Sequence, residues 1–146
     1  MAALALFVGF AGCSKDDGGG PAPVPSVSDV IGKWYVINVE EYEIEDGERL
    51  TWDNSYTKDK TWWYTFFEDG TFEYIDDFLD LDPGVDPRDI GSWSLEGDQL
   101  TLDFGYDDTV YTVKSFSSTT LVILTEWNSE FGDIYYGKTL TLKKTN

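Results

Sequence analysis

From Asp29 to the end of the chain, hydrophobic and polar residues alternate over short runs, and β-branched and aromatic residues fill most hydrophobic positions. Apolar residues at helical spacing are almost absent from this part of the chain, so the pattern predicts strands. The first strand is expected at residues 33–44. A short helical turn over residues 29–32, with Asp29 as its N-cap, is expected to lead into this strand.

Short turns separate the strands that follow. Glu68-Asp69-Gly70 and Glu96-Gly97-Asp98 are strong hairpin signals, because glycine readily adopts the positive φ angles that tight turns need. The strands after the first are expected near residues 49–52, 61–67, 71–76, 90–95, 99–104, 109–116, 119–127 and 134–143.

Strands joined by such short turns must be antiparallel to their neighbours, because the connections leave no room for crossover helices. A single open sheet of this length would leave two unpaired edges, whereas a closed barrel removes them. The fold class is therefore all-β, and we expect an eight-stranded antiparallel up-and-down β-barrel, whose interior is either filled or holds one small ligand. Periodicity alone leaves a β-sandwich as the alternative.

Residues 1–12 form an apolar run that ends in small residues directly before Cys13. The run is too short for a permanent membrane span and is typical of a secretion signal, although no Lys or Arg precedes it. Phe10-Ala11-Gly12-Cys13 resembles the lipobox of bacterial lipoproteins, in which the cysteine is acylated and becomes the new N-terminus. This resemblance implies that Cys13 carries the lipid anchor, so the exported protein should incorporate labelled palmitate.

Ser14-Lys15-Asp16-Asp17 follows the cysteine and resembles the export tag of Bacteroidetes-type lipoproteins. The resemblance implies a protein of a Gram-negative bacterium that is anchored in the outer membrane and displayed on the cell surface. Gly and Pro dominate the next stretch, so residues 13–28 are expected to form the lipidated, flexible tether. The barrel domain is expected at residues 29–146.

The charge and the composition exclude several kinds of function. The chain has 28 acidic and 10 basic residues, a formal net charge of -18, no histidine and one cysteine. Nucleic acid is not an expected partner, because phosphate binding depends on clustered Lys and Arg. Without histidine there is no imidazole general base, and no carboxylate pair stands out for glycoside hydrolysis. We expect no enzyme, no catalytic residues, no cofactor, and a monomer.

Aromatic residues make up 16% of the chain, and most of them should be core. Consecutive residues of a strand point to opposite faces, so at least one of Trp62, Trp63 and Tyr64 should point away from the interior. The aromatic residues that we expect to line a ligand site or to be exposed are Trp62, Trp63, Tyr64, Trp93 and Trp127.

An acidic insertion at residues 76–89 interrupts the tight succession of strands. Carboxylates are calcium ligands, and Asp80, Asp82 and Asp86 are the weak candidates. Their spacing does not match an EF-hand loop, so a solvated lid at the barrel mouth is the preferred interpretation and no metal is expected.

Gly32-Lys33-Trp34 at the start of the first strand resembles the Gly-x-Trp signature of lipocalins, in which the Trp plugs the closed end of the barrel. Residues 64–74, 91–102 and 111–123 resemble the lipocalin-like domains of Bacteroidetes-type surface lipoproteins. Two features depart from the better-known lipocalins: no cysteine pair ties the barrel, and no Arg on the last strand stacks on Trp34. Lys138 or Lys143 is the candidate to replace this Arg.

Three functions fit these observations. The first is a non-enzymatic, lipid-anchored surface lipoprotein whose lipocalin-like barrel binds a small apolar or amphipathic molecule. The second is an adhesion or complex-forming accessory protein that binds a protein partner at the cell surface through exposed aromatics and acidic loops. The third is a carbohydrate-binding module that stacks sugars on exposed rings.

Overall fold

The computed structural model describes residues 24–55, 62–75 and 88–145. Cys13 and the acidic candidates Asp80, Asp82 and Asp86 lie outside the described residues. One short helix precedes nine strands within the described ranges. The elements are α1 (Val27–Val30), β1 (Gly32–Glu45), β2 (Glu48–Ser55), β3 (Trp63–Phe66), β4 (Thr71–Ile75), β5 (Arg88–Glu96), β6 (Gln99–Asp103), β7 (Asp108–Phe116), β8 (Thr120–Asn128) and β9 (Ile134–Lys144).

Eight of these strands close into an antiparallel barrel. Each strand from β3 to β9 pairs with the next one along the chain, and β9 pairs back with β1, which in turn pairs with β3. The expected eight-stranded barrel is therefore confirmed, and the β-sandwich alternative is excluded. The strand expected near residues 49–52 is β2, which pairs with β1 and is not one of the eight barrel strands.

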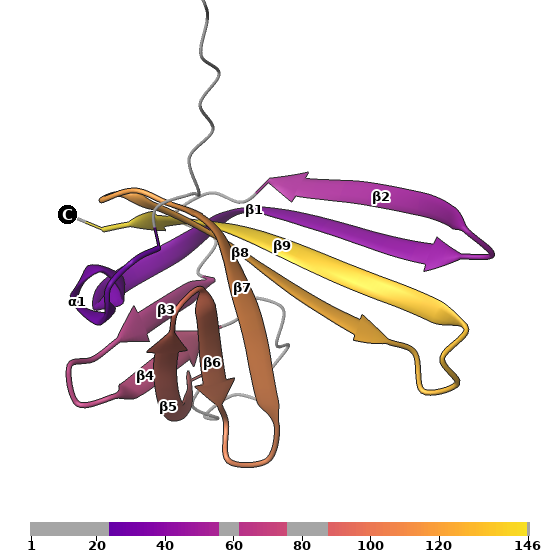
Figure 1. The fold of residues 1–146 in the computed structure, drawn as a ribbon. Helices are drawn as coiled ribbons and strands as arrows, with labels where there is room; N and C mark the ends of the chain where they lie inside the picture. Colours follow the sequence, from indigo (N-terminus) through magenta and orange to yellow (C-terminus); the bar gives the residue numbers. More distant parts are fainter. Residues whose placement is uncertain (1–23, 56–61, 76–87, 146) are drawn as a thin grey trace, which may run out of the picture.

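The first strand is long enough to pair with two strands along one edge. Residues 32–35 of β1 pair with β3, and residues 38–45 pair with β2. Between these two stretches, the register to β9 shifts at Ile37, which marks a β-bulge. Beyond the bulge, β1, β2, β8 and β9 run together away from β3 to β6, and we call this four-stranded extension the arm (Figure 1).

Aromatic and aliphatic side chains fill the barrel beside α1. Alternate residues of each strand point inward, which places every second residue in the core. Within the described residues, no polar or charged residue is buried. The core consists of Val30, Trp34, Val36, Val39, Trp62, Tyr64, Phe66, Phe72, Trp93, Leu100, Leu102, Tyr111, Val113, Leu121, Ile123, Leu140 and Leu142.

Trp34 closes the end of the barrel that α1 covers. Its side chain is fully buried, and its indole N–H donates a hydrogen bond of 2.7 Å to the carbonyl of Val30. Lys144 Nζ lies 5.1 Å from the Trp34 ring centroid and donates a hydrogen bond of 2.8 Å to the carbonyl of Asp29. The lysine that replaces the lipocalin Arg is therefore Lys144, and the expectation of Lys138 or Lys143 was wrong.

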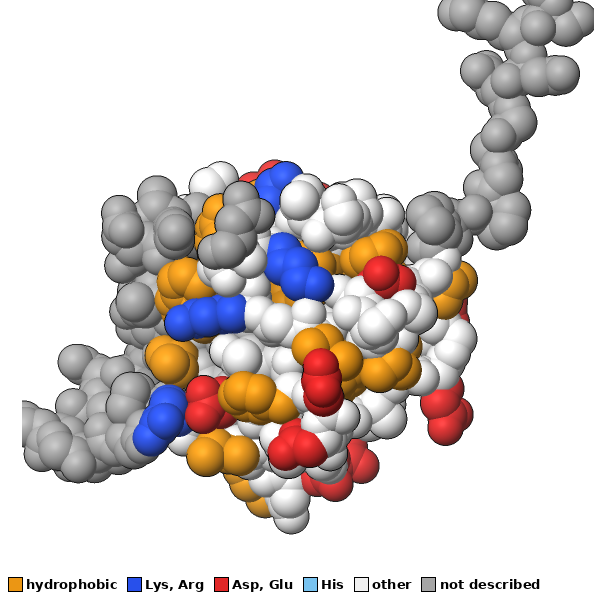
Figure 2. Space-filling view, turned by 90° about the vertical axis from the view of Figure 1, so that its left-hand side faces the viewer, with side chains coloured by type: hydrophobic (Ala, Val, Ile, Leu, Met, Phe, Trp, Pro, Cys, Tyr) orange, Lys and Arg blue, Asp and Glu red, His pale blue; other side chains and the backbone are white. Residues whose placement is uncertain are grey.

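The other two lysines are held by neighbouring strands. Lys138 forms an ion pair with Glu41, and Lys143 donates a hydrogen bond to Thr120. Residue 144 reaches the helix because it lies at the end of β9, beside the start of β1. Figure 2 shows the molecule from the side of α1, with Lys and Arg side chains among hydrophobic ones and most Asp and Glu side chains lower down.

The helical turn begins earlier than the sequence pattern indicates. Ser26 is the N-cap of α1, and Asp29 is the third residue of the helix. The Asp29 carboxylate accepts hydrogen bonds from the Ser26 backbone N–H at 2.9 Å and from its hydroxyl at 2.7 Å, and these bonds lower the pKa of Asp29. The expectation that Asp29 is the N-cap was therefore wrong, because Asp29 closes the capping box from inside the helix.

We predict that Trp34→Phe lowers the free energy of unfolding by about 2–4 kcal/mol, because it removes the bond to Val30 and leaves a cavity. Urea denaturation followed by circular dichroism measures this change. Trp52→Phe is the control, because Trp52 is 44% exposed on β2. Equal urea midpoints for the two variants would show that Trp34 does not close the barrel.

Candidate ligand-binding groove

The candidate site is a groove that opens where β7 and β8 diverge. These two strands pair only where residues 112–116 face residues 121–124. Among the described strands, the first part of β7 pairs with β6 only, and the last part of β8 pairs with β9 only. The gap between them is a groove of about 580 Å³, lined by Asp107, Asp108, Thr109, Val110, Tyr111, Thr125, Glu126, Trp127 and Lys138.

Trp127 supplies an accessible aromatic surface in this groove. Its side chain is 44% exposed and stacks on Tyr136 of β9, with the ring centroids 5.5 Å apart and an interplanar angle of 21°. The register explains this contact, because the two residues lie directly opposite each other in the β8–β9 pair. Val110 on the facing strand β7 is 45% exposed. The groove therefore offers apolar surface that a small molecule can reach.

Lys138 lies across the groove on β9, and its charge is balanced locally. Lys138 Nζ lies 2.8 Å from Glu41 Oε1, and the two residues are opposite each other in the β1–β9 pair. Both side chains are about one-third exposed. The remaining charged residues of the lining, Asp107, Asp108 and Glu126, are all acidic.

A buried group of hydroxyls lies between the groove and the core. Tyr111 lines the groove and is itself buried, and a side-chain hydrogen bond joins it to Tyr64. Burial is the main cause that raises the pKa of Tyr64 well above its ordinary value, and it also raises the pKa of Tyr111. Both phenols therefore stay neutral at physiological pH.

Glu126 is positioned from the outer face of the arm. Tyr42 of β1 and Glu126 of β8 both lie opposite Gly137 of β9, and the Tyr42 hydroxyl donates a hydrogen bond to Glu126 across this glycine. A Cβ at position 137 would overlap the Tyr42 ring, so only glycine leaves room for the ring to cross β9.

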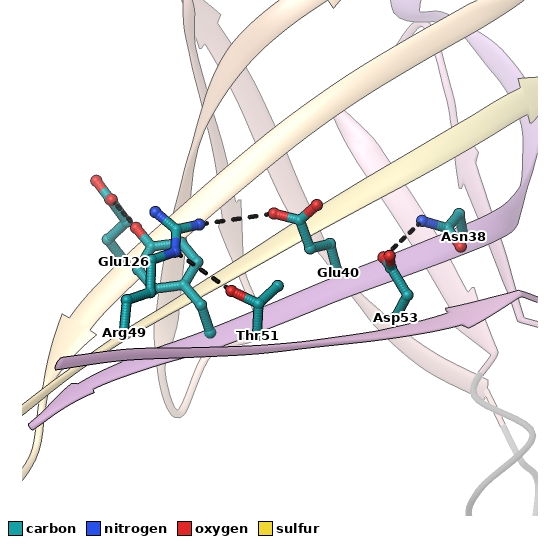
Figure 3. Close-up of polar contacts among 7 residues, drawn as sticks. Asn38, Glu40, Arg49, Thr51, Asp53 and Glu126 are labelled. Atoms are coloured by element: carbon teal, nitrogen blue, oxygen red, sulfur yellow. Dashed lines mark hydrogen bonds and ion pairs between the residues drawn. The ribbon is translucent and has the colours of Figure 1, made fainter.

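Arg49 covers the Tyr42 ring from β2. Its guanidinium carbon lies 3.7 Å from the ring centroid, and its Nη2 atom lies 3.7 Å from Glu40 Oε1. Its Nε–H donates a hydrogen bond of 3.3 Å to the Thr51 hydroxyl. Figure 3 shows these contacts as one polar row over β1 and β2, with Glu126 at its far end. The row ties the arm strands together on the face opposite Trp127.

The structure separates the aromatic residues that the sequence singled out. Trp127 lines the groove, whereas Trp62, Tyr64 and Trp93 are buried in the core. The indole N–H of Trp93 donates a hydrogen bond to the Phe67 carbonyl.

Trp63 is the ring of its strand that points outward. It is half-buried, packs against Tyr35 with the ring centroids 5.4 Å apart, and lies 4.1 Å below Lys33 Nζ. The strand alternation at residues 62–64 is therefore as expected, with one ring on the outer wall and two in the core.

Sequence reasoning did not identify the polar residues of the groove. Asp107, Asp108, Glu126 and Lys138 come from three strands and one turn, and no motif joins them in the sequence. The register break in the β7–β8 pair, between Val113 and Ser115, accompanies the divergence, and alternation of apolar residues carries no signal for it.

The described residues contain neither a metal-binding cluster nor a membrane-spanning helix. No cluster of three or more Cys, Asp or Glu residues there is arranged to hold a metal ion. None of the helical structure in residues 24–55, 62–75 and 88–145 has the length and apolarity of a membrane-spanning helix.

We predict that stability between pH 10 and 12 depends on Tyr42. Desolvation and the bond to Glu126 raise the pKa of Tyr42 from 10.0 to about 12. Its neutral form is thus favoured in the folded state, so this stabilisation is complete below about pH 10 and is lost as the pH rises towards 12. Urea midpoints should fall less over this range for Tyr42→Phe than for the wild type, because the other tyrosines are common to both proteins. Parallel falls would contradict the assignment.

Comparison with known proteins places this fold in a family. No curated protein matches the chain. A similar solved structure, a deswapped triple mutant of the bovine odorant-binding protein, has a TM-score of 0.45 and 13% sequence identity, and the likeness covers 80% of this chain and 74% of that chain. The sequence model of a family described as a lipocalin-like domain matches residues 30–123. That match spans more than half of the chain, and so the protein belongs to the lipocalin-like domain family.

Proposed function

We propose that this protein binds a small apolar or amphipathic molecule in the groove between β7 and β8, and that it acts by binding without catalysis. The observation that carries the proposal is the groove of about 580 Å³ beside the exposed Trp127. This volume lies within the range of roughly 300–1,000 Å³ that is usual for small-molecule sites. Membership of the lipocalin-like family supports a binding role for the barrel.

The packing of the barrel favours the mouth over the centre as the binding position. The core side chains Trp34, Phe66, Phe72, Leu100 and Leu140 are all fully buried. A ligand at the centre would have to displace several of these side chains, at a cost of one to several kcal/mol each, about the cost of overpacking a core. A ligand in the groove contacts Trp127 and Tyr111 with the core left intact.

We predict that a bound ligand changes tryptophan fluorescence through Trp127. Titration with fatty acids, retinoids and octanol should change the emission of the wild type, and Trp127→Ala should bind about tenfold more weakly because it loses the aromatic contact. Trp52→Ala is a matched control, because Trp52 is also 44% exposed but does not line the groove. Equal loss of binding in both variants, or no binding by the wild type, would overturn the proposal.

We further propose that Cys13 carries a lipid that anchors the protein in the outer membrane, with the barrel on the cell surface. The apolar run before Cys13 and the flexible composition of residues 14–28 support this proposal. Several acyl chains on one cysteine would hold the protein stably, whereas a single chain gives only marginal binding.

We predict that the wild type, produced in a Gram-negative host, incorporates labelled palmitate and fractionates with the outer membrane. Cys13→Ser should lose both the label and the membrane association, because the thiol is the acceptor. Protease added to intact cells should cleave the anchored barrel if it faces outward. A wild type without label, or a labelled Cys13→Ser variant, would refute lipidation at this residue.

A further inference from the structure

The walls of the groove carry an excess of negative charge that no described basic residue balances. Three of its lining residues, Asp107, Asp108 and Glu126, are acidic, and the one lysine of the lining is already 2.8 Å from Glu41. The ion pairs found among the described residues join Arg49, Arg88 and Lys138 to other carboxylates. The potential in the groove is therefore negative, and a ligand with a carboxylate or a sulfate binds more weakly there than a ligand of the same size with a positive charge.

The acidic groups lie on both sides of the groove. Asp107 and Asp108 are at the start of β7, and Glu126 is near the end of β8. The Tyr42 hydroxyl donates a hydrogen bond to Glu126, which holds this carboxylate on the face of the arm opposite Trp127. A cation in the groove would thus be attracted by Asp107 and Asp108, and Glu126 adds to the negative potential from the other face of β8.

Aromatic rings in this protein already hold cations at three places. Lys33 lies 4.1 Å from the centroid of Trp63, Arg49 lies 3.7 Å from that of Tyr42, and Lys144 lies 5.1 Å from that of Trp34. Among the described residues, Trp127 is in none of the cation–π contacts found, although its ring is 44% exposed. A ring stacked on Tyr136, in a groove whose lining includes three acidic residues, is a favourable position for an organic ammonium group.

We propose that the groove selects organic cations: a small amphipathic ligand places its ammonium group against the Trp127 ring, in the part of the groove whose lining includes Asp107 and Asp108, and its apolar part along Val110 and Tyr111. This inference rests on the proposed function, because it concerns the same groove. It adds the sign of the ligand's charge, which the size and apolarity of the groove do not specify. Lys138 does not oppose the ligand, because Glu41 neutralises it.

The experiment compares three probes with one alkyl chain and different head groups: octyltrimethylammonium, octanol and octyl sulfate. Each is titrated into the protein by calorimetry below the concentration at which micelles form, and circular dichroism verifies that the protein stays folded. We expect the cation to bind at least about tenfold more tightly than octyl sulfate, with octanol between them. Equal affinity for the cation and the sulfate, or tighter binding of the sulfate, would overturn the inference.

Two double variants separate the groove from the general charge of the chain, which is -18. Asp107→Asn with Asp108→Asn should reduce the preference for the cation several-fold. Glu96→Gln with Asp98→Asn makes the same change of net charge in the β5–β6 turn, which does not line the groove, and should leave the preference unchanged. Equal reductions in both would assign the preference to the whole molecule and refute the groove as its source.

The outcomes also distinguish this inference from the proposed function. If octanol and octyl sulfate bind as tightly as the cation and Trp127→Ala weakens all three, the groove is a ligand site without charge selection. In that case the proposed function stands and the inference fails. If none of the three probes binds, the proposed function fails as well.

Discussion

The antiparallel pairing of β1 with β9 is the contact on which the rest of the structure depends. It joins the first and last strands of the barrel over residues 34–45 of β1 and residues 134–144 of β9, which leaves the barrel with no open edge there. Both strands continue past the point where β3 ends, so a second partner, β2, covers the remaining edge of β1. Because β8 stays paired with β9 up to Asn128, its pairing with β7 ends at Leu124, and the groove opens between β7 and β8.

The two ends of the β1–β9 pair differ in how their side chains are packed. Rings and aliphatic side chains fill the barrel near α1, and Trp34 and Lys144 close it there. The arm is held together by contacts between neighbouring strands. In one of them the Tyr42 ring lies over Gly137, and in another Lys138 forms an ion pair with Glu41. Exposed ion pairs of this kind add little stability each, at about 0–1 kcal/mol.

Strand periodicity and turn chemistry were enough to predict the class of fold. Alternation in residues 33–44 and the glycine turns at Gly70 and Gly97 predict antiparallel strands because they are local properties of the chain, whereas the barrel was expected because it leaves no unpaired edge. The Gly-x-Trp signature placed Trp34 at the closed end for the same reason. Lys144 was missed because its position depends on where β9 ends relative to α1, which is a non-local property. Ser26 was missed because serine and aspartate are both preferred N-cap residues, so the sequence alone does not choose between Ser26 and Asp29.

The groove could be predicted only in part. Trp127 was among the aromatic residues expected to line a ligand site or to be exposed, and it lines the groove. Its partners come from the turn before β7, from β8 and from β9, and they meet only because the β7–β8 pairing stops at residues 112 and 124. Nothing in the pattern of apolar residues specifies where two paired strands separate. The charge of the groove could not be predicted either. The chain has 28 acidic residues, and the sequence does not show which of them meet in the groove.

The measurement that tests this account most directly is a nuclear Overhauser spectrum of the labelled protein in solution. Glu41 with Lys138 and Glu43 with Tyr136 are opposite each other in the β1–β9 pair. They alternate with the pairs that exchange hydrogen bonds, so their Hα atoms lie close together. The closed β1–β9 pairing predicts strong Hα–Hα signals for both pairs. Absence of these signals, with the β3 to β9 pairings intact, would show an open sheet and would contradict both the closed barrel and the groove that its closure creates.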